Sequence, residues 1–600
     1  MRGAAARIRE AGLQMKRFLL IGTSILLCVQ AQGQVLYVPS EYSKIQLAIN
    51  DANDWDTVIV SQDRYQENIN FLGKAITVQS TDPNDPDVVA GTIIDGNAPT
   101  DSNFGSVVIF NSGEDANSVL SGFTITGGTG SWLLVSWEFL GLRWNRCGGG
   151  AVCYNMSAPT ITKNVFTGNT AGQGGGIYIY GDPVNPNDPS NPSVHVSPIV
   201  TDNTFIDNSA FAAHGFAPPD ANYPNNDHGD GGAIVGFQGV DAIIKGNLIE
   251  NNHADYYGGA IHLRQWSDGE ICKNQILSND SLLGAGIHIT YTSAPLIADN
   301  LIESNISPGG GGGIYVFYYS DALIERNFIT QNESSSGAGI AVYTFSEPQI
   351  HNNLVVKNTG LGILCQPEGA IIITGNTISD NYPYFSSGGG GIYYMVGDGL
   401  LIENNIITSN DDFGISGDDS AATIRYNDVW GSELGNYGGE LSDQNEINGN
   451  ISVEPLFVDD QNDDYHLKSN GWRWDTPGNG WQWDDATSRC IDAGNPGYVL
   501  AEEPLTVPDD PDGQRGKNLR INMGAYGATA EASLPPLGWM LHADITNDGI
   551  VDFTDLTFFV QSWFEIGQNI PADLNRDQTV NLPDFAIFAN DWLSKAGWYE

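Results

Sequence analysis

Short apolar runs separated by polar and glycine-rich turns fill the middle of the chain, and paired asparagines mark these turns. Two asparagines five residues apart, around an aliphatic or β-branched pair, occur nine times, and from Asn247 to Asn353 the copies lie 26 or 27 residues apart. The pairs are Asn164/Asn169, Asn203/Asn208, Asn247/Asn252, Asn274/Asn279, Asn300/Asn305, Asn327/Asn332, Asn353/Asn358, Asn376/Asn381 and Asn405/Asn410. Because no repeat contains a segment long enough for a helix, the period predicts one coil of a solenoid per repeat.

Each coil is expected to hold two or three short strands, with equivalent residues of successive coils about 4.8 Å apart. The stacked asparagines should then hydrogen-bond along the solenoid as a ladder. An interior aliphatic row is expected from Ile249, Ile276, Ile302, Ile329 and Ile378. A leucine-rich repeat is the main alternative, but these coils carry isoleucine and glycine where that repeat needs leucine and a helical segment.

The segment before the repeats has the pattern of a cap for the open end of the solenoid. Residues 43–52 place Ile45, Ala48, Ile49 and Ala52 on one face of an amphipathic helix, which would shield unpaired strand edges. Short strands are expected at Thr57–Val60, Ile69–Phe71, Ala75–Val78 and Thr92–Ile94. Long insertions at 130–146, 181–197 and 212–230 are expected to shape a binding face.

The repeats resemble the right-handed parallel β-helix of the pectin-lyase-like superfamily. The opening segment is similar as well, in its motifs Ile45-Gln46-x-Ala48-Ile49, Asp56 to Val60, Tyr65-x-Glu67 and Lys74 to Val78. The resemblance spans residues 35–455. It implies the fold and leaves the reaction open, because this architecture serves many activities.

The repeat pattern stops near residue 456, and the segment that follows resembles the closing segment of secreted bacterial β-helix proteins. It contains four closely spaced tryptophans, Trp472, Trp474, Trp481 and Trp483. We expect these rings to cover the final coil, and stacking on sugars is the alternative. Residues 533–538 have the composition of a linker.

Two twelve-residue acidic loops near the C-terminus have the spacing of EF-hand loops. A calcium ion takes about six to eight oxygen ligands, which such a loop supplies from positions 1, 3, 5, 7, 9 and 12. The predicted ligands are Asp544, Thr546, Asp548, the Ile550 carbonyl, Asp552 and Asp555 in the first loop, and Asp573, Asn575, Asp577, the Thr579 carbonyl, Asn581 and Asp584 in the second. An amphipathic helix is expected after each loop.

The two loops begin 29 residues apart and resemble a type I dockerin over residues 542–595. The resemblance implies bound Ca²⁺ and docking to a cohesin-like protein or attachment at the cell surface. Two positions depart from the family pattern. Thr546 stands where asparagine is usual, and Gln578 replaces the turn glycine, whose backbone favours a left-handed conformation.

The strand after each glycine turn predicts two outward-facing columns of side chains. The first column is Tyr178, Val235, His262, His288, Tyr315 and Ala341, and the second is Tyr180, Phe237, Arg264, Thr290, Phe317 and Tyr343. Aromatic rings beside imidazole and guanidinium groups suit a polysaccharide, although rings stacked only to stabilise the solenoid would give the same pattern. The predicted substrate-binding residues are Tyr178, Tyr180, Phe237, Trp266, Tyr315 and Phe317.

Five of the nine histidines lie between residues 214 and 288, with several aspartates among them. A uronate lyase needs a base and a cation, for which His262 and Arg264 are candidates. A hydrolase needs two carboxylates across the bond, with candidates Asp227, Asp230, Asp255, Asp418 and Asp419. The predicted catalytic set is His262, Arg264, His288, Asp230 and Asp255. The Gly-His-Gly and Arg-Ile-Lys signatures of polygalacturonases are missing, which favours a non-enzymatic scaffold.

The net charge and an N-terminal targeting signal limit the possible partners of the protein and the compartment in which it acts. A net charge of −47 argues against a nucleic-acid partner. Lys16 and Arg17 precede an apolar run over residues 18–29 and small residues suited to cleavage, which predicts a signal peptide starting at Met1 or Met15. We expect no membrane-spanning segment. Cys147 and Cys153 flank a glycine run and are candidates for a local disulfide in an oxidising compartment.

These patterns predict an all-β chain with a small α-helical domain at its C-terminus. The expected parts are a signal peptide (1–33), a right-handed parallel β-helix (34–455), its closing segment (456–531), a linker (532–541) and an EF-hand-like domain (542–600). The expected function is binding or degradation of extracellular polysaccharide, such as a polyuronate, by a secreted or cell-surface protein tethered through its calcium-dependent module. The alternative is a non-enzymatic adhesion scaffold, and whether the protein is an enzyme stays open.

Overall fold

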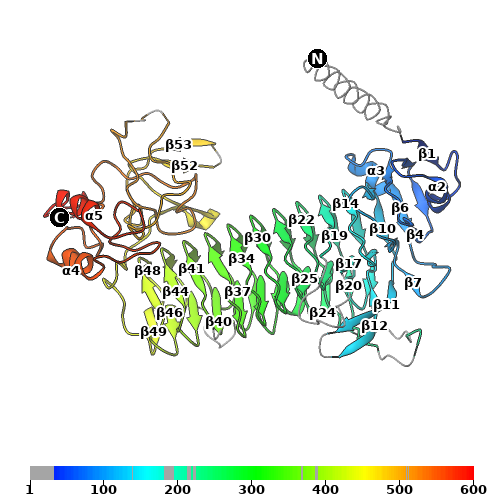
Figure 1. Cartoon of the computed structure of the whole chain (residues 1–600), viewed down its shortest axis with the longest axis horizontal. Helices are drawn as coiled ribbons and strands as arrows, with labels where there is room; N and C mark the ends of the chain where they lie inside the picture. Colours follow the sequence, from blue (N-terminus) through cyan, green and yellow to red (C-terminus); the bar gives the residue numbers. More distant parts are fainter. Residues whose placement is uncertain are drawn as a thin grey trace, which may run out of the picture.

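A computed structural model describes residues 33–137, 140–181, 195–212, 218–220, 225–366, 369–384, 390–476, 478–508, 510 and 512–599. The chain forms a rod of stacked coils with a smaller helical unit at its C-terminal end (Figure 1). Apart from Gly33, the predicted signal peptide lies outside the described residues, as does His214.

Three long parallel sheets run along the rod. The first has 14 strands, from β1 (Val35–Val38) to β47 (Thr423–Arg425), and the second has 13, from β3 (Asp63–Tyr65) to β48 (Asp428–Trp430). The third also has 13 strands. It comprises β4 (Ile69–Asn70), β8 (Val108–Phe110), β13 (Ala151–Cys153), β17 (Ile177–Tyr180), β21 (Ile234–Phe237), β25 (Ile261–Arg264), β29 (Ile287–Thr290), β33 (Ile314–Phe317), β37 (Ile340–Tyr343), β40 (Ile363–Gln366), β43 (Ile392–Tyr394), β46 (Phe413–Gly417) and β49 (Gly435–Gly439).

A shorter sheet of six strands joins these three. Its strands are β16 (Thr170–Ala171), β20 (Ser209–Ala210), β24 (His253–Tyr257), β28 (Asp280–Leu283), β32 (Ile306–Ser307) and β36 (Glu333–Ser334). Between residues 104 and 439 the described chain contains no helix, so the leucine-rich-repeat alternative is excluded and the predicted parallel β-helix is confirmed.

Both predicted asparagine ladders are present, and their side chains are buried. At Asn279 the backbone N–H and the Nδ2 group each donate to Asn305 Oδ1 at 3.0 Å, and Nδ2 also donates to the Ile249 carbonyl at 3.0 Å. The ladder that begins at Asn164 continues past the predicted pairs through Asn427 to Asn450. Each ladder asparagine therefore satisfies buried main-chain groups of its neighbouring coils.

The predicted interior row is also confirmed by the strand register. Ile249 pairs with Ile276, and the row continues through Ile302 and Ile329 to Ile378. Val355 occupies the coil between the last two isoleucines. These side chains are fully buried in one continuous core that runs along the solenoid.

The N-terminal end is closed as expected. Helix α2 (Ile45–Asp51) buries three of the four side chains predicted to face the core, and the fourth, Ala52, is buried at the C-cap. Strands β2 (Thr57–Val60), β5 (Thr77–Ser80) and β6 (Thr92–Asp95) follow. A further short helix, α3 (Pro86–Gly91), was not predicted; it starts with a proline and is capped by the Asp85 side chain.

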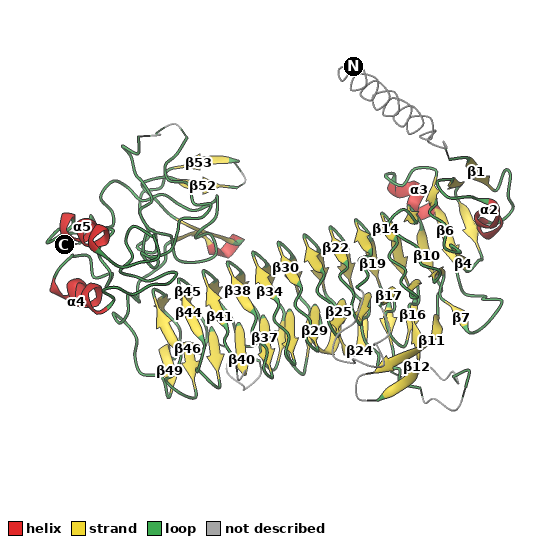
Figure 2. Ribbon diagram, in the orientation of Figure 1, coloured by secondary structure: helices red, strands yellow, loops and turns green. Residues whose placement is uncertain are grey.

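The insertion at 130–146 forms an antiparallel hairpin, β11 (Gly130–Trp137) and β12 (Gly141–Cys147), which projects from one side of the rod (Figure 2). The candidate disulfide between Cys147 and Cys153 is not formed, because both cysteines are free. Cys147 belongs to an apolar cluster outside the coils, whereas Cys153 faces the inner core. The two thiols lie on opposite sides of the third sheet.

The C-terminal part contains two small hairpins and two helices. The hairpins are β50 (Phe457–Asp459) with β51 (Asp464–Leu467) and β52 (Arg473–Asp475) with β53 (Gly480–Gln482). The helices are α4 (Phe553–Gln561) and α5 (Leu582–Asn590). The cluster that closes the last coil is built from residues such as Ile406, Tyr426 and Met523, so the prediction that the four tryptophans cover this coil is wrong.

Candidate functional site

The third sheet carries both predicted columns in register. Tyr178 pairs with Val235, and the first column continues through His262, His288 and Tyr315. In the second column Arg264 pairs with Phe237 on one side and with Thr290 on the other. The residues between them along each strand belong to the inner core, so both columns face outward.

At the N-terminal end of these columns the hairpin covers the sheet. Leu133, Val135 and Trp137 of β11 form one apolar cluster with Tyr178, Tyr180 and Phe237. Tyr178 and Phe237 are consequently buried, at 0% and 1% exposure. A ligand approaching this end of the face would meet the hairpin first.

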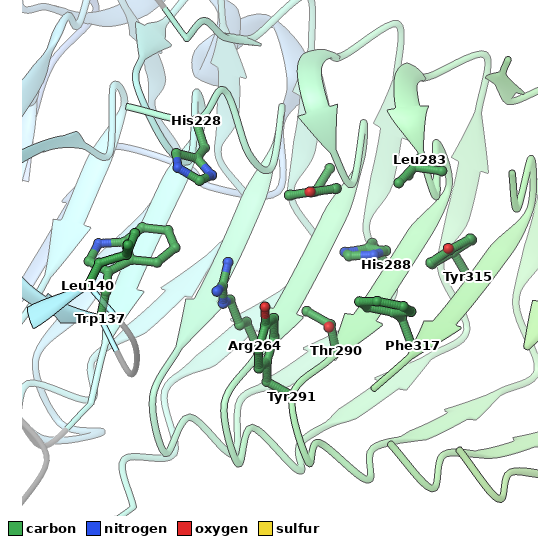
Figure 3. Close-up of a pocket in the computed structure, with 11 residues that line it drawn as sticks. Trp137, Leu140, His228, Arg264, Leu283, His288, Thr290, Tyr291, Tyr315 and Phe317 are labelled. Atoms are coloured by element: carbon green, nitrogen blue, oxygen red, sulfur yellow. The ribbon is translucent and has the colours of Figure 1, made fainter. Parts of the chain in front are cut away.

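Beyond the hairpin edge the face opens into a pocket of about 340 Å³ (Figure 3). Its walls come from the hairpin, the third sheet, the six-stranded sheet and the turns beside them. The lining residues are Trp137, Leu140, His228, Tyr257, Arg264, Leu283, His288, Thr290, Tyr291, Tyr315 and Phe317. Of the predicted site residues, Arg264, His288, Tyr315 and Phe317 therefore meet in one place.

Among the described residues, Arg264 is the one arginine that lines this pocket, and its guanidinium lies between aromatic rings. Its Cζ atom is 4.4 Å from the centre of the Trp137 ring and 4.3 Å from that of Tyr291. Burial lowers the pKa of Arg264, and the Asp230 charge raises it. No carboxylate in the described chain forms an ion pair with this guanidinium, and its Nε has no hydrogen-bond partner among the described residues.

Two neighbouring imidazoles, tilted relative to each other, flank the arginine. The rings of His262 and His288 lie 4.7 Å apart, and Tyr257 stacks on His288 at 5.0 Å. Within the described residues, all four ring nitrogens and the Thr290 hydroxyl lack hydrogen-bond partners. Burial lowers the pKa of His288 to about 3, so this ring is neutral at physiological pH. His262 lies outside the pocket lining and contacts the rings of Tyr257 and His288.

The candidate carboxylates are dispersed. Asp230 is buried beside β21, and burial raises its pKa to about 7. Asp227 accepts a hydrogen bond from the Arg146 backbone N–H at 2.7 Å. Asp255 lies on β24, where it accepts from the Ala212 N–H and pairs with His253. None of these three lines the pocket.

Other residues of the site were missed in the sequence, and one predicted residue lies elsewhere. Trp266 occupies the turn after β25 with a left-handed backbone and is not part of the lining. Tyr291 occupies the equivalent turn one coil further, and it does line the pocket. Trp137 and Leu140 come from the insertion, whose length was the only signal in the sequence.

The two acidic loops share one hydrogen-bonding pattern. In the first, Asp544 accepts from the N–H groups of Asp548 and Gly549, and Asp555 accepts from those of Thr546 and Asp552. In the second loop the equivalent acceptors, Asp573 and Asp584, accept from the same four loop positions. Gln578 adopts a φ of 69°, so it takes the left-handed conformation that glycine has in the first loop.

The first loop also has the donors for a cation. Carboxylate oxygens of Asp544, Asp548 and Asp555 lie within 4.8 Å of one another. Burial raises the pKa of Asp544 to about 7, and the neighbouring charges of Asp555 and Asp548 act in the same direction. A hard divalent cation with oxygen ligands fits this donor set. Asp552 and Asn581 are the N-caps of helices α4 and α5, each with a reciprocal capping box.

The helical unit also exposes large apolar side chains to solvent. They are Phe553, Val560, Phe564, Ile566, Leu582 and Leu593, each at least 59% exposed. In the part of the chain that the structure describes, no helix has the length and apolarity needed to cross a bilayer.

Comparison with known proteins supports the fold. A family model described as "Right handed beta helix region" matches residues 284–386. A "Chlamydia polymorphic membrane protein repeat" model matches residues 165–180, which span one set of coil strands. No curated protein matches the chain. The family match and the three long parallel sheets agree that residues 284–386 belong to a right-handed parallel β-helix.

Proposed function

We propose that this protein is a secreted or cell-surface β-helix protein whose pocket binds an acidic extracellular polysaccharide, such as a polyuronate. The observation that carries the proposal is the buried guanidinium of Arg264, which no described carboxylate approaches within ion-pair distance. Leaving a buried charge unpaired is costly, and a ligand carboxylate would remove that cost. The repeat match at residues 165–180 supports a surface setting.

The other groups of the pocket suit the remaining parts of a sugar. Tyr315 and Phe317 offer ring faces for the apolar side of a pyranose. The Thr290 hydroxyl and the His288 ring nitrogens, which lack partners in the described chain, suit its hydroxyl groups. An unpaired buried polar atom costs roughly 1–3 kcal/mol, so a ligand that meets these atoms gains affinity.

Binding is favoured over cleavage in this proposal. A base with a pKa of about 3, such as His288, is too weak to remove a proton beside a carboxylate at neutral pH. A hydrolase would need two carboxylates on opposite sides of the bond, and the described residues of the pocket lining include neither aspartate nor glutamate.

The proposal is tested with the mature chain and a panel of acidic polysaccharides, each paired with its carboxyl-reduced neutral form. We expect measurable binding by calorimetry to at least one acidic polymer and none to its neutral partner, with no unsaturated products or new reducing ends. Equal binding to both forms would refute the role of the carboxylate. Unsaturated products would instead show that the protein is a lyase.

Affinity for the acidic glycan is expected to fall as the pH rises from about 5.5 to about 8.5, by roughly 3- to 10-fold. Burial raises the pKa of Asp230 to about 7, so this group gains its negative charge within that range and competes with the ligand for Arg264. Asp227, whose pKa is raised to about 6, acts in the same direction. His288 stays neutral throughout.

Titration calorimetry at several pH values measures this dependence, and Asp230→Asn is the matched variant. The variant should bind with affinity that varies much less with pH. An affinity that rises with pH in the unchanged protein would contradict the prediction.

We also propose that the C-terminal module tethers the protein through calcium-dependent docking to a protein partner of cohesin-like type. The exposed apolar side chains of α4, α5 and their flanking turns favour this role over that of a simple end cap. The first loop contributes the buried oxygen donors that a calcium ion requires.

Replacing both Phe564 and Ile566 by aspartate should release most of the protein from the cell surface into the medium, since these side chains are 72% and 79% exposed. Immunoblotting of cell and medium fractions of the native host measures the change. Glycan binding should be unaltered, because the pocket lies on other elements. Unchanged retention at the surface would count against docking through this face.

A further inference from the structure

Position 4 of each acidic loop carries a residue that does not belong to the predicted calcium ligands. These residues are Asn547 and Arg576, and both have left-handed backbones, with φ of 59° and 61°. Each stands directly between the predicted ligands at positions 3 and 5. Any ion that fixes those two neighbours would also fix the direction in which the position 4 side chain points.

Asn547 connects the first loop to the end of the β-helix. Its Nδ2 group donates to the Gly449 carbonyl at 2.8 Å and to the Ala493 carbonyl at 2.7 Å. Gly449 follows the last coil, and Ala493 belongs to the closing segment. Asn547 is 2% exposed, so these two hydrogen bonds are shielded from water.

Arg576 has the equivalent role in the second loop. Its Nε donates to the Pro496 carbonyl at 3.1 Å, and its Nη2 donates to the Leu519 carbonyl. Both acceptors are in the closing segment. Two residues of different type, at the same position of two similar loops, thus bind neighbouring parts of the same surface.

We call the interface between the acidic loops and the end of the β-helix, with its closing segment, the seam. The β-helix side of the seam also contributes hydrogen-bond donors. Arg520 Nη1 donates to the Asp544 carbonyl at 2.8 Å, and the Tyr426 hydroxyl donates to the Ile545 carbonyl at 3.0 Å. Arg520 and Tyr426 are both nearly inaccessible to solvent. Residues 544–547 of the first loop are therefore held by hydrogen bonds to the last coil and to the closing segment.

We propose that calcium in the two acidic loops holds the C-terminal module against the end of the β-helix, an effect we call the lock. Asn547 and Arg576, which we call the latch residues, make the hydrogen bonds that join the two parts. The inference rests on the calcium binding proposed above. Without a cation, the clustered carboxylates of Asp544, Asp548 and Asp555 repel one another. A bound cation removes that repulsion and orders positions 3 and 5, which holds each latch in its docked direction.

The lock matters because the module covers apolar surface at the end of the solenoid. Met540 and Ala596 of the C-terminal region pack in one cluster with Ile406, Tyr426 and Ile451 of the last coils. Undocking would expose this cluster to solvent. Exposed apolar surface of this kind promotes association between chains.

Ions can exchange while the module stays docked. A cavity of about 770 Å³ lies between the last coil and the first loop, and Thr546 and Asp548 are among its lining residues. Asp548 is exposed, whereas Asp544 and Asp555 are fully buried. The loop therefore has an open side through which a chelator can remove calcium.

Hydrogen–deuterium exchange of the mature full chain tests the lock, with calcium or with an excess of chelator. Seam peptides covering residues 448–453, 490–497 and 519–523 should exchange at least about tenfold faster without calcium, because their protection depends on docking. Strand β29 (Ile287–Thr290) is the internal reference and should not change. The double variant Asn547→Ala/Arg576→Ala should exchange fast at the seam even with calcium present, whereas the exposed control Asn590→Ala should behave like the unchanged chain.

Equilibrium dialysis of calcium on the same samples separates the possible failures. Bound calcium in the unchanged chain and in the double variant, with fast seam exchange only in the variant, supports the lock. Bound calcium with seam exchange that ignores the chelator would overturn the lock and leave the calcium sites standing. No bound calcium at all would overturn both proposals.

Discussion

Changing Asn252 to alanine is expected to lower the free energy of unfolding by about 3–5 kcal/mol, one of the largest effects of any single substitution in the coils. Asn252 is fully buried and accepts hydrogen bonds from the backbone N–H and the Nδ2 group of Asn208. Its own Nδ2 group donates to the Phe205 carbonyl and to Asn279 Oδ1. Alanine would leave these groups unsatisfied in the core of three adjacent coils.

Asn251→Ala is the matched control, because it makes the same change one residue away on an exposed side chain. Asn251 has a φ of 54°, so alanine there should cost only about 1 kcal/mol of backbone strain. Chemical denaturation followed by circular dichroism measures both variants. Equal losses for Asn251→Ala and Asn252→Ala would show that the ladder contributes little to stability.

Replacing Arg264 by alanine should weaken binding of the acidic glycan about 100-fold, or roughly 2.7 kcal/mol. The substitution removes the only arginine of the pocket lining and leaves the ligand carboxylate without a partner. Arg264→Lys should lose about tenfold, because lysine keeps the charge and loses the planar contact with the rings of Trp137 and Tyr291. Calorimetry at pH 6 is the measurement.

Arg326→Ala is the control for this experiment. Arg326 is 45% exposed and pairs with Asp299 and Glu325 at a turn away from the pocket. Its removal should leave glycan affinity within about twofold, because exposed ion pairs are screened by solvent. If Arg264→Ala binds as well as Arg326→Ala, the guanidinium does not contact the ligand.

The repeat period accounts for most of what the sequence predicted correctly. The paired asparagines and the isoleucine row lie where the period places them. A shift of the strand register by one residue would move every inward-facing side chain to the outer face, so the register is strongly specified. The outward columns of β17 to β37 follow from the same register. Local repetition therefore determined the coils, their stacking and the direction of each side chain.

The pocket could not be derived in the same way. Its walls depend on where an insertion folds. Nothing in the spacing of the repeats shows that the centre of the Trp137 ring lies 4.4 Å from Arg264 Cζ. The hairpin also buries Tyr178 and Phe237, which their outward direction alone would leave open. The carboxylate Asp255 shares a sequence neighbourhood with the histidines, but it lies on another sheet.

The C-terminal module, too, could be predicted from the sequence only in part. The spacing of the two loops predicted the positions of α4 and α5, whose N-caps are the ninth residue of each loop. The contacts of Asn547 and Arg576 with the β-helix join residues up to 98 positions apart, and no local motif encodes them. Docking between domains depends on surface shape, which a single sequence does not display.

The most direct test of the proposed function is a structure of the mature chain with a bound acidic oligosaccharide identified in the binding panel. The account predicts a sugar in the pocket beside the hairpin, with its carboxylate against the Arg264 guanidinium and a ring against Tyr315 or Phe317. An oligosaccharide bound on another face, with the Arg264 pocket occupied only by water, would contradict it.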